Sequence, residues 1–270
     1  MGIPDDAVAR QWLTTVSYYR LSAYFYPFKQ PDESFKHGTS FATVQMLYEF
    51  DRALRLLLLG AIERVEVALR TAVTYQLALK MGPFAHCQPE AFEPRFRHGD
   101  FMLELDDAEK HSQESFVQHF RQKYTEERDL PIWMATELLS FGTISRLVQF
   151  LRADGLKQVA RTFNTTETFL GSWMHSLSYV RNLCAHHGRL WNRTLTVKPR
   201  LPSPSRWFPF KVDRNDSIYC ILVLTHHLLG AIYPTGKWPA QVKALFDNFP
   251  AVPILSAGIP GDWRDRSPWR

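Results

Sequence analysis

The sequence is poor in cysteine and in long apolar runs. Its 270 residues include three cysteines, an odd number that fits a reducing compartment rather than a disulfide scaffold. The N-terminus has no basic region followed by an apolar segment, so it does not resemble a signal peptide. The most apolar runs, 56–62 and 218–224, are far shorter than the roughly 20 residues that span a bilayer. We therefore expect a cytoplasmic protein that does not enter a membrane.

Positively and negatively charged residues are nearly balanced. The chain has 32 Lys and Arg against 27 Asp and Glu, a formal net charge of +5, which allows an anionic partner without requiring one. Hydrophobic residues make up 45% and aromatic residues 14% of the chain, enough to build a substantial core. This composition excludes intrinsic disorder.

Common enzyme motifs are also missing. The sequence has no glycine-rich phosphate loop, no G-x-S-x-G elbow, no H-E-x-x-H and no paired C-x-x-C. Cys184 and His187 are three residues apart, but Cys220 and the pair 226–227 lie too far along the chain to complete a four-ligand zinc pattern. We predict neither a metal site nor a cofactor.

The pattern of apolar residues is helical throughout. Between 41 and 80 there is no proline, and apolar residues recur close to every 3.6 positions, which predicts one long helix with Gly60 as a candidate bend. Further helices are expected at 100–124, 132–151 (with a candidate break at 142–143), 166–188, 217–232 and 239–248. No repeat and no strand pattern stands out, so the prediction is an all-α bundle of about five to seven helices.

The chain reads as a single domain with four parts. An N-terminal segment covers 1–40, a helical core 41–188, a basic and aromatic connection 189–215, and C-terminal helices with a tail 216–270. The connection contains four prolines and little periodicity, which is typical of an irregular segment.

The residues with the most chemical potential lie at the end of the 166–188 helix. Asn182 and His186 are one helical turn apart, and Arg181 lies five residues before His186, about 140° around the helix. His175, Tyr179 and Arg189 extend the same polar stripe. Arginine supplies a fixed positive charge for phosphate, and histidine exchanges protons near neutral pH. These residue types suit phosphodiester chemistry.

Arg181-Asn182-x-x-x-His186 resembles the R-x4-6-H motif of the HEPN superfamily. The chain as a whole resembles the Abi-like family of bacterial abortive-infection proteins of the AbiD/AbiF type. The blocks that carry this resemblance are 18–24 with 27–28, 50–55, 61–70, 131–134, 137–143, 173–177, 181–193 and 261–263. They cover nearly the whole chain, although the segment before Tyr18 is shorter than the family leads us to expect.

The resemblance implies a metal-independent ribonuclease with a HEPN-like core. In that chemistry the ribose 2′-OH attacks the neighbouring phosphate and leaves a 2′,3′-cyclic phosphate and a 5′-OH. The resemblance assigns acid–base work to His186, oxyanion stabilisation to Arg181 and an orienting role to Asn182. His187 is the alternative histidine, because R-x5-H also fits the motif. The family further implies a homodimer in which two such motifs face each other.

Each of these residues also has a structural reading. Arg181 could pair with a carboxylate of the long helix, Glu63 or Glu66. His175 fits a packing role, and the Tyr18-Tyr19-Arg20 block fits an anchor for the N-terminal segment.

The connection 189–215 has two readings of similar weight. Arg189, Arg193, Lys198 and Arg200 are candidate RNA-binding residues, with aromatic residues between them for base stacking. Alternatively, the aromatic residues of this segment pack on the bundle.

The functional prediction is a ribonuclease of a phage-defence or toxin system, with RNA as substrate. Two alternatives stay open at this point. One is an RNA-binding protein that assembles with a noncoding RNA and does not cleave it. The other is a toxin component that is restrained by an antitoxin or by covalent modification.

Overall fold

A single long helix organises the molecule. The computed structural model describes residues 1–3 and 5–270, and within them the chain forms eleven α-helices and no strand beyond isolated bridges. The long helix, α3 (Phe41–Met81), is unbroken, as the absence of proline predicted. Ser40 caps its start by accepting a hydrogen bond from the N–H of Thr43, and Gly82, with a φ of +83°, ends it.

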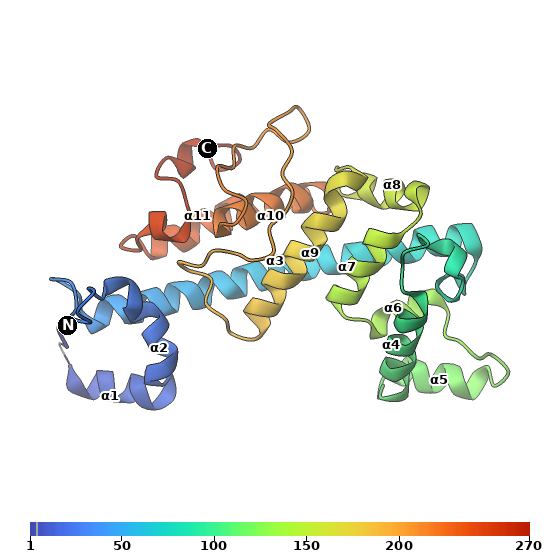
Figure 1. The fold of residues 1–270 in the computed structure, drawn as a ribbon, viewed down its shortest axis with the longest axis horizontal. Helices are drawn as coiled ribbons and strands as arrows, with labels where there is room; N and C mark the ends of the chain where they lie inside the picture. Colours follow the sequence, from blue (N-terminus) through green and yellow to red (C-terminus); the bar gives the residue numbers. More distant parts are fainter. Residues whose placement is uncertain (4) are drawn as a thin grey trace.

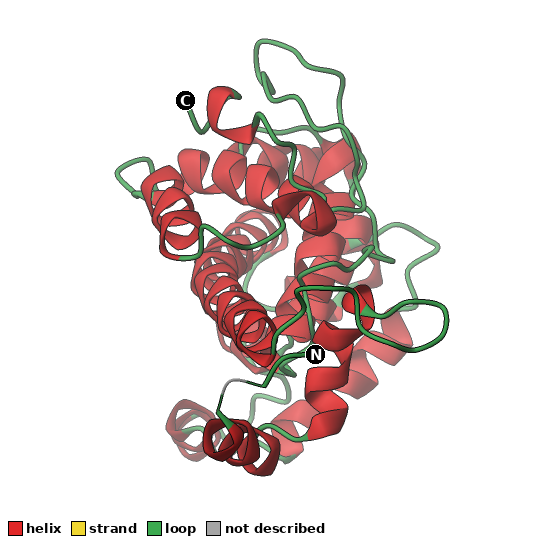
Figure 2. Ribbon diagram, turned by 90° about the vertical axis from the view of Figure 1, so that its left-hand side faces the viewer, coloured by secondary structure: helices red, strands yellow, loops and turns green. Residues whose placement is uncertain are grey.

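The other helices are arranged along α3 (Figure 1). The helices α2, α6, α8, α9 and α10 all pack against it, and α7 packs mainly on α9. Figure 2 shows the same helices and their connecting loops from the end of the molecule. Their bounds are α1 (Asp6–Thr15), α2 (Tyr18–Phe25), α4 (His98–Lys110), α5 (Ser115–Lys123), α6 (Ile132–Leu138), α7 (Phe141–Phe150), α8 (Ala153–Thr162), α9 (Glu167–Ala185), α10 (Ile218–Ile232) and α11 (Trp238–Asn248).

The all-α prediction is confirmed, but the expected number of helices was too low. The predicted helix 100–124 is two helices, α4 and α5, and 132–151 is also two, α6 and α7. The second break lies at Leu139 and Ser140 rather than at 142–143, because the Ser140 hydroxyl caps α7. The apolar residues keep their helical spacing across both breaks, so the sequence pattern did not reveal them. The helix α8 was not predicted.

One hydrophobic core joins all parts of the chain. It extends from Ala9 in α1 to Trp269 near the C-terminus. Trp191, Phe208 and Phe210 of the connection 189–215 are buried in it. The tail is held by aromatic contacts such as that between Trp263 and Phe246, whose ring centroids are 4.9 Å apart. The core thus fixes both flanks of the turn that follows α9.

Candidate functional site

The C-terminal end of α9 is a tight, closed turn. The helix ends at Ala185, before the predicted position, and the N–H of Gly188 donates to the carbonyl of Leu183 at 2.7 Å. His187 has a φ of +57°, a conformation that usually selects glycine or asparagine at this place in a helix cap. The chain therefore reverses direction here, and the side chains of His186 and His187 are both exposed.

A buried carboxylate holds the chain that leaves this turn. Asp51 of α3 is fully buried, and it accepts hydrogen bonds from the backbone N–H groups of Leu190 at 3.1 Å and Trp191 at 2.6 Å. Its Oδ2 also accepts from the Tyr24 hydroxyl and from Nη1 of Arg55, both at 2.6 Å. Burial, followed by the charge of Asp51, raises the pKa of Tyr24 well above its usual value, so this hydroxyl stays protonated and donates.

The N-terminal segment is attached to the same turn. Arg20 of α2 donates from Nη1 to the carbonyl of His187 at 2.8 Å, and Arg189 donates to the carbonyl of Ala23, also at 2.8 Å. Within the block 18–20, it is Arg20 that makes the anchoring contact, since Tyr18 and Tyr19 are 61% and 89% exposed. The helix α2, the helix α3 and the turn after α9 thus meet next to the two histidines.

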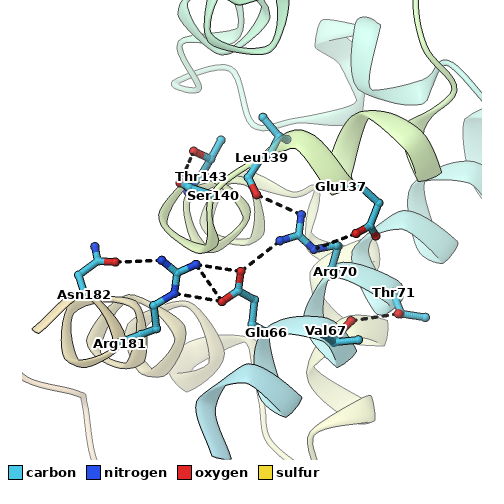
Figure 3. A network of polar contacts seen from close by, with 10 residues as sticks. All are labelled: Glu66, Val67, Arg70, Thr71, Glu137, Leu139, Ser140, Thr143, Arg181 and Asn182. Carbon is cyan, nitrogen blue, oxygen red and sulfur yellow. Dashed lines mark hydrogen bonds and ion pairs between the residues drawn. The ribbon is translucent and has the colours of Figure 1, made fainter. Parts of the chain in front are cut away.

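Arg181 is held by a second carboxylate of α3, Glu66 (Figure 3). Nε of Arg181 lies 3.2 Å from Oε2 of Glu66, and Nη2 lies 3.1 Å from both carboxylate oxygens. Nη1 donates to Oδ1 of Asn182 at 3.2 Å. The structural reading of Arg181 as an ion-pair partner of Glu66 is therefore confirmed, and Glu63 is not its partner.

A second arginine shares Glu66. Nη2 of Arg70 lies 3.1 Å from Oε1 of Glu66, and Nη1 donates to the carbonyl of Leu139 at the same distance. The Arg181 side chain is 28% exposed and that of Glu66 is 13% exposed. Nε of Arg70 also lies 4.0 Å from Glu137 (Figure 3). The two guanidinium groups and their carboxylates form what we call the Glu66 cluster, in which Arg181 is the more exposed of the two arginines.

The predicted residues divide between two hollows. Asn182 lines one of about 640 Å³ between α7 and α9, together with His175 and Tyr179. His187 lines another of about 480 Å³, together with Arg20 of α2 and residues from α3 and the ends of α1 and α9. Within the described residues, Arg181 and His186 line neither hollow. One chain thus brings Arg181, Asn182 and Glu66 together and directs His187 to a different recess.

The basic connection is largely engaged in internal contacts. Nε of Arg193 donates to the carbonyl of Arg189 at 2.7 Å, and Nζ of Lys198 lies 3.2 Å from Asp216. Arg200 is exposed, and its side chain forms no ion pair among the described residues. The aromatic residues follow the packing alternative: Trp191 and Phe208 are buried, and Trp207 packs 5.7 Å from Phe169.

Sequence reasoning missed Asp51 and Arg55, which form an ion pair of 2.6 Å inside the core. A signal for them existed. Both lie on the side of α3 that carries the buried Leu47, Leu54 and Leu58, and oppositely charged residues four apart on an apolar face indicate a buried pair.

The described residues hold neither a cluster of metal ligands nor a membrane-spanning helix. Among the residues the structure describes, no group of three or more His, Cys, Asp or Glu side chains is arranged to hold a metal ion. None of the described helices combines the length and apolarity needed to cross a membrane.

Comparison with known proteins identifies the family. A search of curated proteins and a search of solved structures each found no significant match. The family model described as "Abi-like protein" matches residues 11–192, about two thirds of the chain. That range contains Arg20, Asp51, Arg55, Glu66 and the whole of α9 with its following turn. The chain therefore belongs to the Abi-like protein family.

Proposed function

We propose that the protein is a metal-independent endoribonuclease of the HEPN type. The observation that carries this proposal is the end of α9, where a partly exposed arginine is held by Glu66 and two exposed histidines follow in a strained turn. Strained backbone conformations cluster at functional sites. An oriented guanidinium and a group that titrates near neutral pH are the two components that cleavage of a phosphodiester by its own 2′-OH requires.

The reaction divides between these groups. A histidine removes the proton from the ribose 2′-OH, whose oxygen bonds to the adjacent phosphorus as the bond to the 5′-oxygen breaks. A second histidine gives a proton to the departing 5′-oxygen. Arg181 stabilises the additional negative charge on the phosphoryl oxygens, and Asn182, bonded to Nη1 of Arg181, orients it.

The proposed enzyme is a homodimer. In a single chain Glu66 neutralises much of the charge of Arg181, and the reaction needs two proton-transfer groups. Two copies that face each other through the ends of α9 supply two arginines and two pairs of histidines to one cleft. Phosphate held between two guanidinium groups is bound more strongly than by either one alone.

Membership of the Abi-like family suggests a role in abortive infection, in which an infected cell is arrested. The proposed substrate is RNA inside that cell, in the cytoplasm. An antitoxin, or an RNA bound at the site, is the proposed restraint on the activity before infection.

The decisive experiment is cleavage of single-stranded RNA by the purified protein in EDTA, with chemical identification of the ends. We expect 2′,3′-cyclic phosphate and 5′-OH ends. His186→Ala and His187→Ala, measured in parallel, identify the proton-transfer residue, because His187 lines the hollow beside Arg20 whereas His186 lines neither hollow. Cleavage that both variants retain in full contradicts the proposal.

A second candidate function is an RNA-binding protein that assembles with a noncoding RNA without cutting it. The observation that favours it is the pairing of Arg181 with Glu66 in one chain, which leaves the guanidinium able to hold phosphate but less able to stabilise a transition state. This protein would retain RNA through purification. Its affinity would depend on salt, with no pH optimum for cleavage.

A further inference from the structure

We infer that single-stranded RNA binds along one exposed face of α3, over two adjacent hollows that begin at His187 and end at Tyr233. We call this surface the α3 track. The inference deepens the proposed function, because it names where the substrate strand lies. It also moves the RNA-binding surface away from the basic connection 189–215.

The track follows a regular row of residues on α3. Arg52, Leu56, Gly60 and Arg64 are spaced four residues apart, which places them in a slanted row that turns by about 120° around the helix from end to end. All four are exposed. The span from Arg52 to Arg64 is about 18 Å at 1.5 Å per residue, longer than a single nucleotide. A Cβ placed at Gly60 would meet no atom within 4 Å, so the middle of the row is open.

Two hollows lie along this row and share Leu56. The first, of about 480 Å³, contains His187, Arg20 and Arg52 among its lining residues. The second, of about 470 Å³, lies between α3 and the segment that joins α10 to α11, and it includes Arg64, Tyr233 and Lys237. Both volumes fall within the roughly 300–1,000 Å³ of pockets that hold small molecules, so each can receive a nucleotide unit.

The charge of the hollows is of one sign. No Asp or Glu is among the described residues that line either one. Arg20, Arg64 and Lys237 form no ion pair within the described part of the chain, whereas Arg52 has one loose partner, Glu49, at 3.8 Å. Arg55 is neutralised by Asp51 and contributes no net charge. The remaining cations form a row that suits the phosphates of a nucleic-acid strand.

An aromatic ring stands at the far end of the row. Tyr233 is 42% exposed, and the guanidinium carbon of Arg64 lies 4.5 Å from the centre of its ring. The turn that follows approaches this ring closely, because a Cβ at Gly236 would come within 2.7 Å of it. These contacts hold the ring in place, and its exposed part together with the guanidinium plane of Arg64 forms a surface on which a base can stack. Stacking of bases on aromatic rings and arginine planes is a general means of holding single strands.

The contrast with the basic connection supports this assignment. There Trp191 and Phe208 are buried in the core, and Lys198 is paired with Asp216. That segment retains exposed cations such as Arg200 and Arg206 but no freely exposed aromatic ring among them. The α3 track combines unpaired cations, an exposed ring and an end at one of the two candidate histidines.

The test measures RNA binding independently of RNA cleavage. The probe is a short fluorescein-labelled single strand with 2′-O-methyl riboses, which lacks the attacking hydroxyl and therefore stays intact. Its affinity is measured by fluorescence anisotropy at several salt concentrations. The variants are Arg64→Glu with Lys237→Glu, the single change Tyr233→Ala, and a matched control, Arg200→Glu with Arg206→Glu, which alters the net charge by the same amount.

We expect the Arg64/Lys237 variant to bind about 10-fold or more weakly, and the slope of log affinity against log salt to fall by about 1.4, at about 0.7 per lost phosphate contact. Tyr233→Ala should weaken binding with an unchanged slope, since stacking releases no counterions. The control should bind nearly as tightly as the unaltered protein. Circular dichroism checks that each variant is folded.

Three outcomes overturn the inference. In the first, the control loses as much affinity as the track variant, and in the second, the unaltered protein fails to bind the probe. In the third, the track variant changes the sedimentation coefficient but not the affinity. The last would make this face a contact between two copies of the chain. Binding that depends on the track in a protein that cuts no RNA would leave the inference standing and contradict the proposed ribonuclease.

Discussion

Two carboxylates of α3 hold the two flanks of the candidate site, and they do so in different ways. Asp51 is fully buried and accepts hydrogen bonds from a tyrosine, an arginine and two backbone N–H groups. Glu66 is 13% exposed and binds two guanidinium groups, one of which belongs to the partly exposed Arg181. Asp51 itself is closed to solvent, whereas Arg181 on Glu66 is partly accessible.

The difference indicates that the two carboxylates of α3 have different roles, one structural and one functional. A fully buried carboxylate with every contact inside the protein fixes a backbone turn and is costly to disturb. A partly exposed carboxylate can instead orient an arginine whose positive charge is accessible to a ligand. Such a pair contributes less to the stability of the fold. We therefore regard Asp51 as the residue that shapes the turn bearing the histidines, and Glu66 as the residue that positions Arg181.

The largest expected effect on stability follows removal of Asp51. Asp51→Ala leaves Arg55 buried without a counter-charge and the N–H groups of Leu190 and Trp191 without an acceptor. Breaking a buried pair in this way costs about 3–5 kcal/mol, which urea unfolding measures. The exposed Asp265→Ala is the matched control, expected to change stability by less than about 0.5 kcal/mol. If Asp51→Ala and Asp265→Ala changed stability equally, Asp51 would not have the structural role that distinguishes it from Glu66.

A fall in pH offers a way to weaken the fold without a substitution. Burial lowers the pKa of His86 from 6.5 to about 4, so between these values the unfolded chain binds a proton that the folded chain does not. This contribution to stability is complete above pH 6.5 and falls by at most about 3 kcal/mol as the pH drops to about 4. The stability of His86→Ala, measured across this range, should depend less on pH. An unchanged pH dependence would contradict the assignment.

Glu66→Gln should have a smaller effect on stability. The neutral amide cannot balance Arg70 and Arg181, which are both partly buried, and the expected loss is about 1–3 kcal/mol. Because Arg181 loses the group that orients it, RNA cleavage should fall in the same variant even where it is fully folded. Glu63→Gln, on the exposed side of α3, is the control. A stable variant with undiminished cleavage would show that Glu66 does not position Arg181.

The smallest effect is a change in thiol reactivity beside the Asp51 network. Burial raises the pKa of Cys184 to about 12, so at pH 8 about one part in 10,000 is the reactive thiolate. Alkylation by iodoacetamide, followed by peptide mass spectrometry, should be slow. Asp51→Asn should accelerate it by loosening the turn, and Glu66→Gln should not. Equal acceleration in both would indicate that the two networks are coupled.

The long helix and the all-α class were predictable because they depend on local rules. The span 41–81 has no proline and an uninterrupted apolar period, and Ser217 and Ser40 are capping residues at the expected starts of α10 and α3. The breaks at 111–114 and 139–140 were not predictable from periodicity, because a capping serine or a short polar stretch interrupts a helix without disturbing the apolar pattern around it.

The site was predictable only in part. Arg181, Asn182 and the two histidines are close in sequence, so their spacing could be recognised. Arg20, Asp51 and Glu66 join them only after folding, and no local rule pairs a carboxylate at 51 with backbone N–H groups at 190 and 191. For the connection 189–215 the sequence left RNA binding and packing both open for the same reason, because the burial of Trp191 and Phe208 depends on the rest of the bundle.

The measurement that tests the central claim most directly is the rate of RNA cleavage by Arg181→Ala beside the unaltered protein, at a temperature where both are fully folded. The control is Arg206→Ala, an exposed arginine outside the Glu66 cluster. Loss of a group that stabilises the developing phosphoryl charge lowers the rate about 100-fold or more. We predict that loss for Arg181→Ala and none for Arg206→Ala. Equal rates for all three proteins would contradict the claim that the Glu66 cluster is the chemical centre of the molecule.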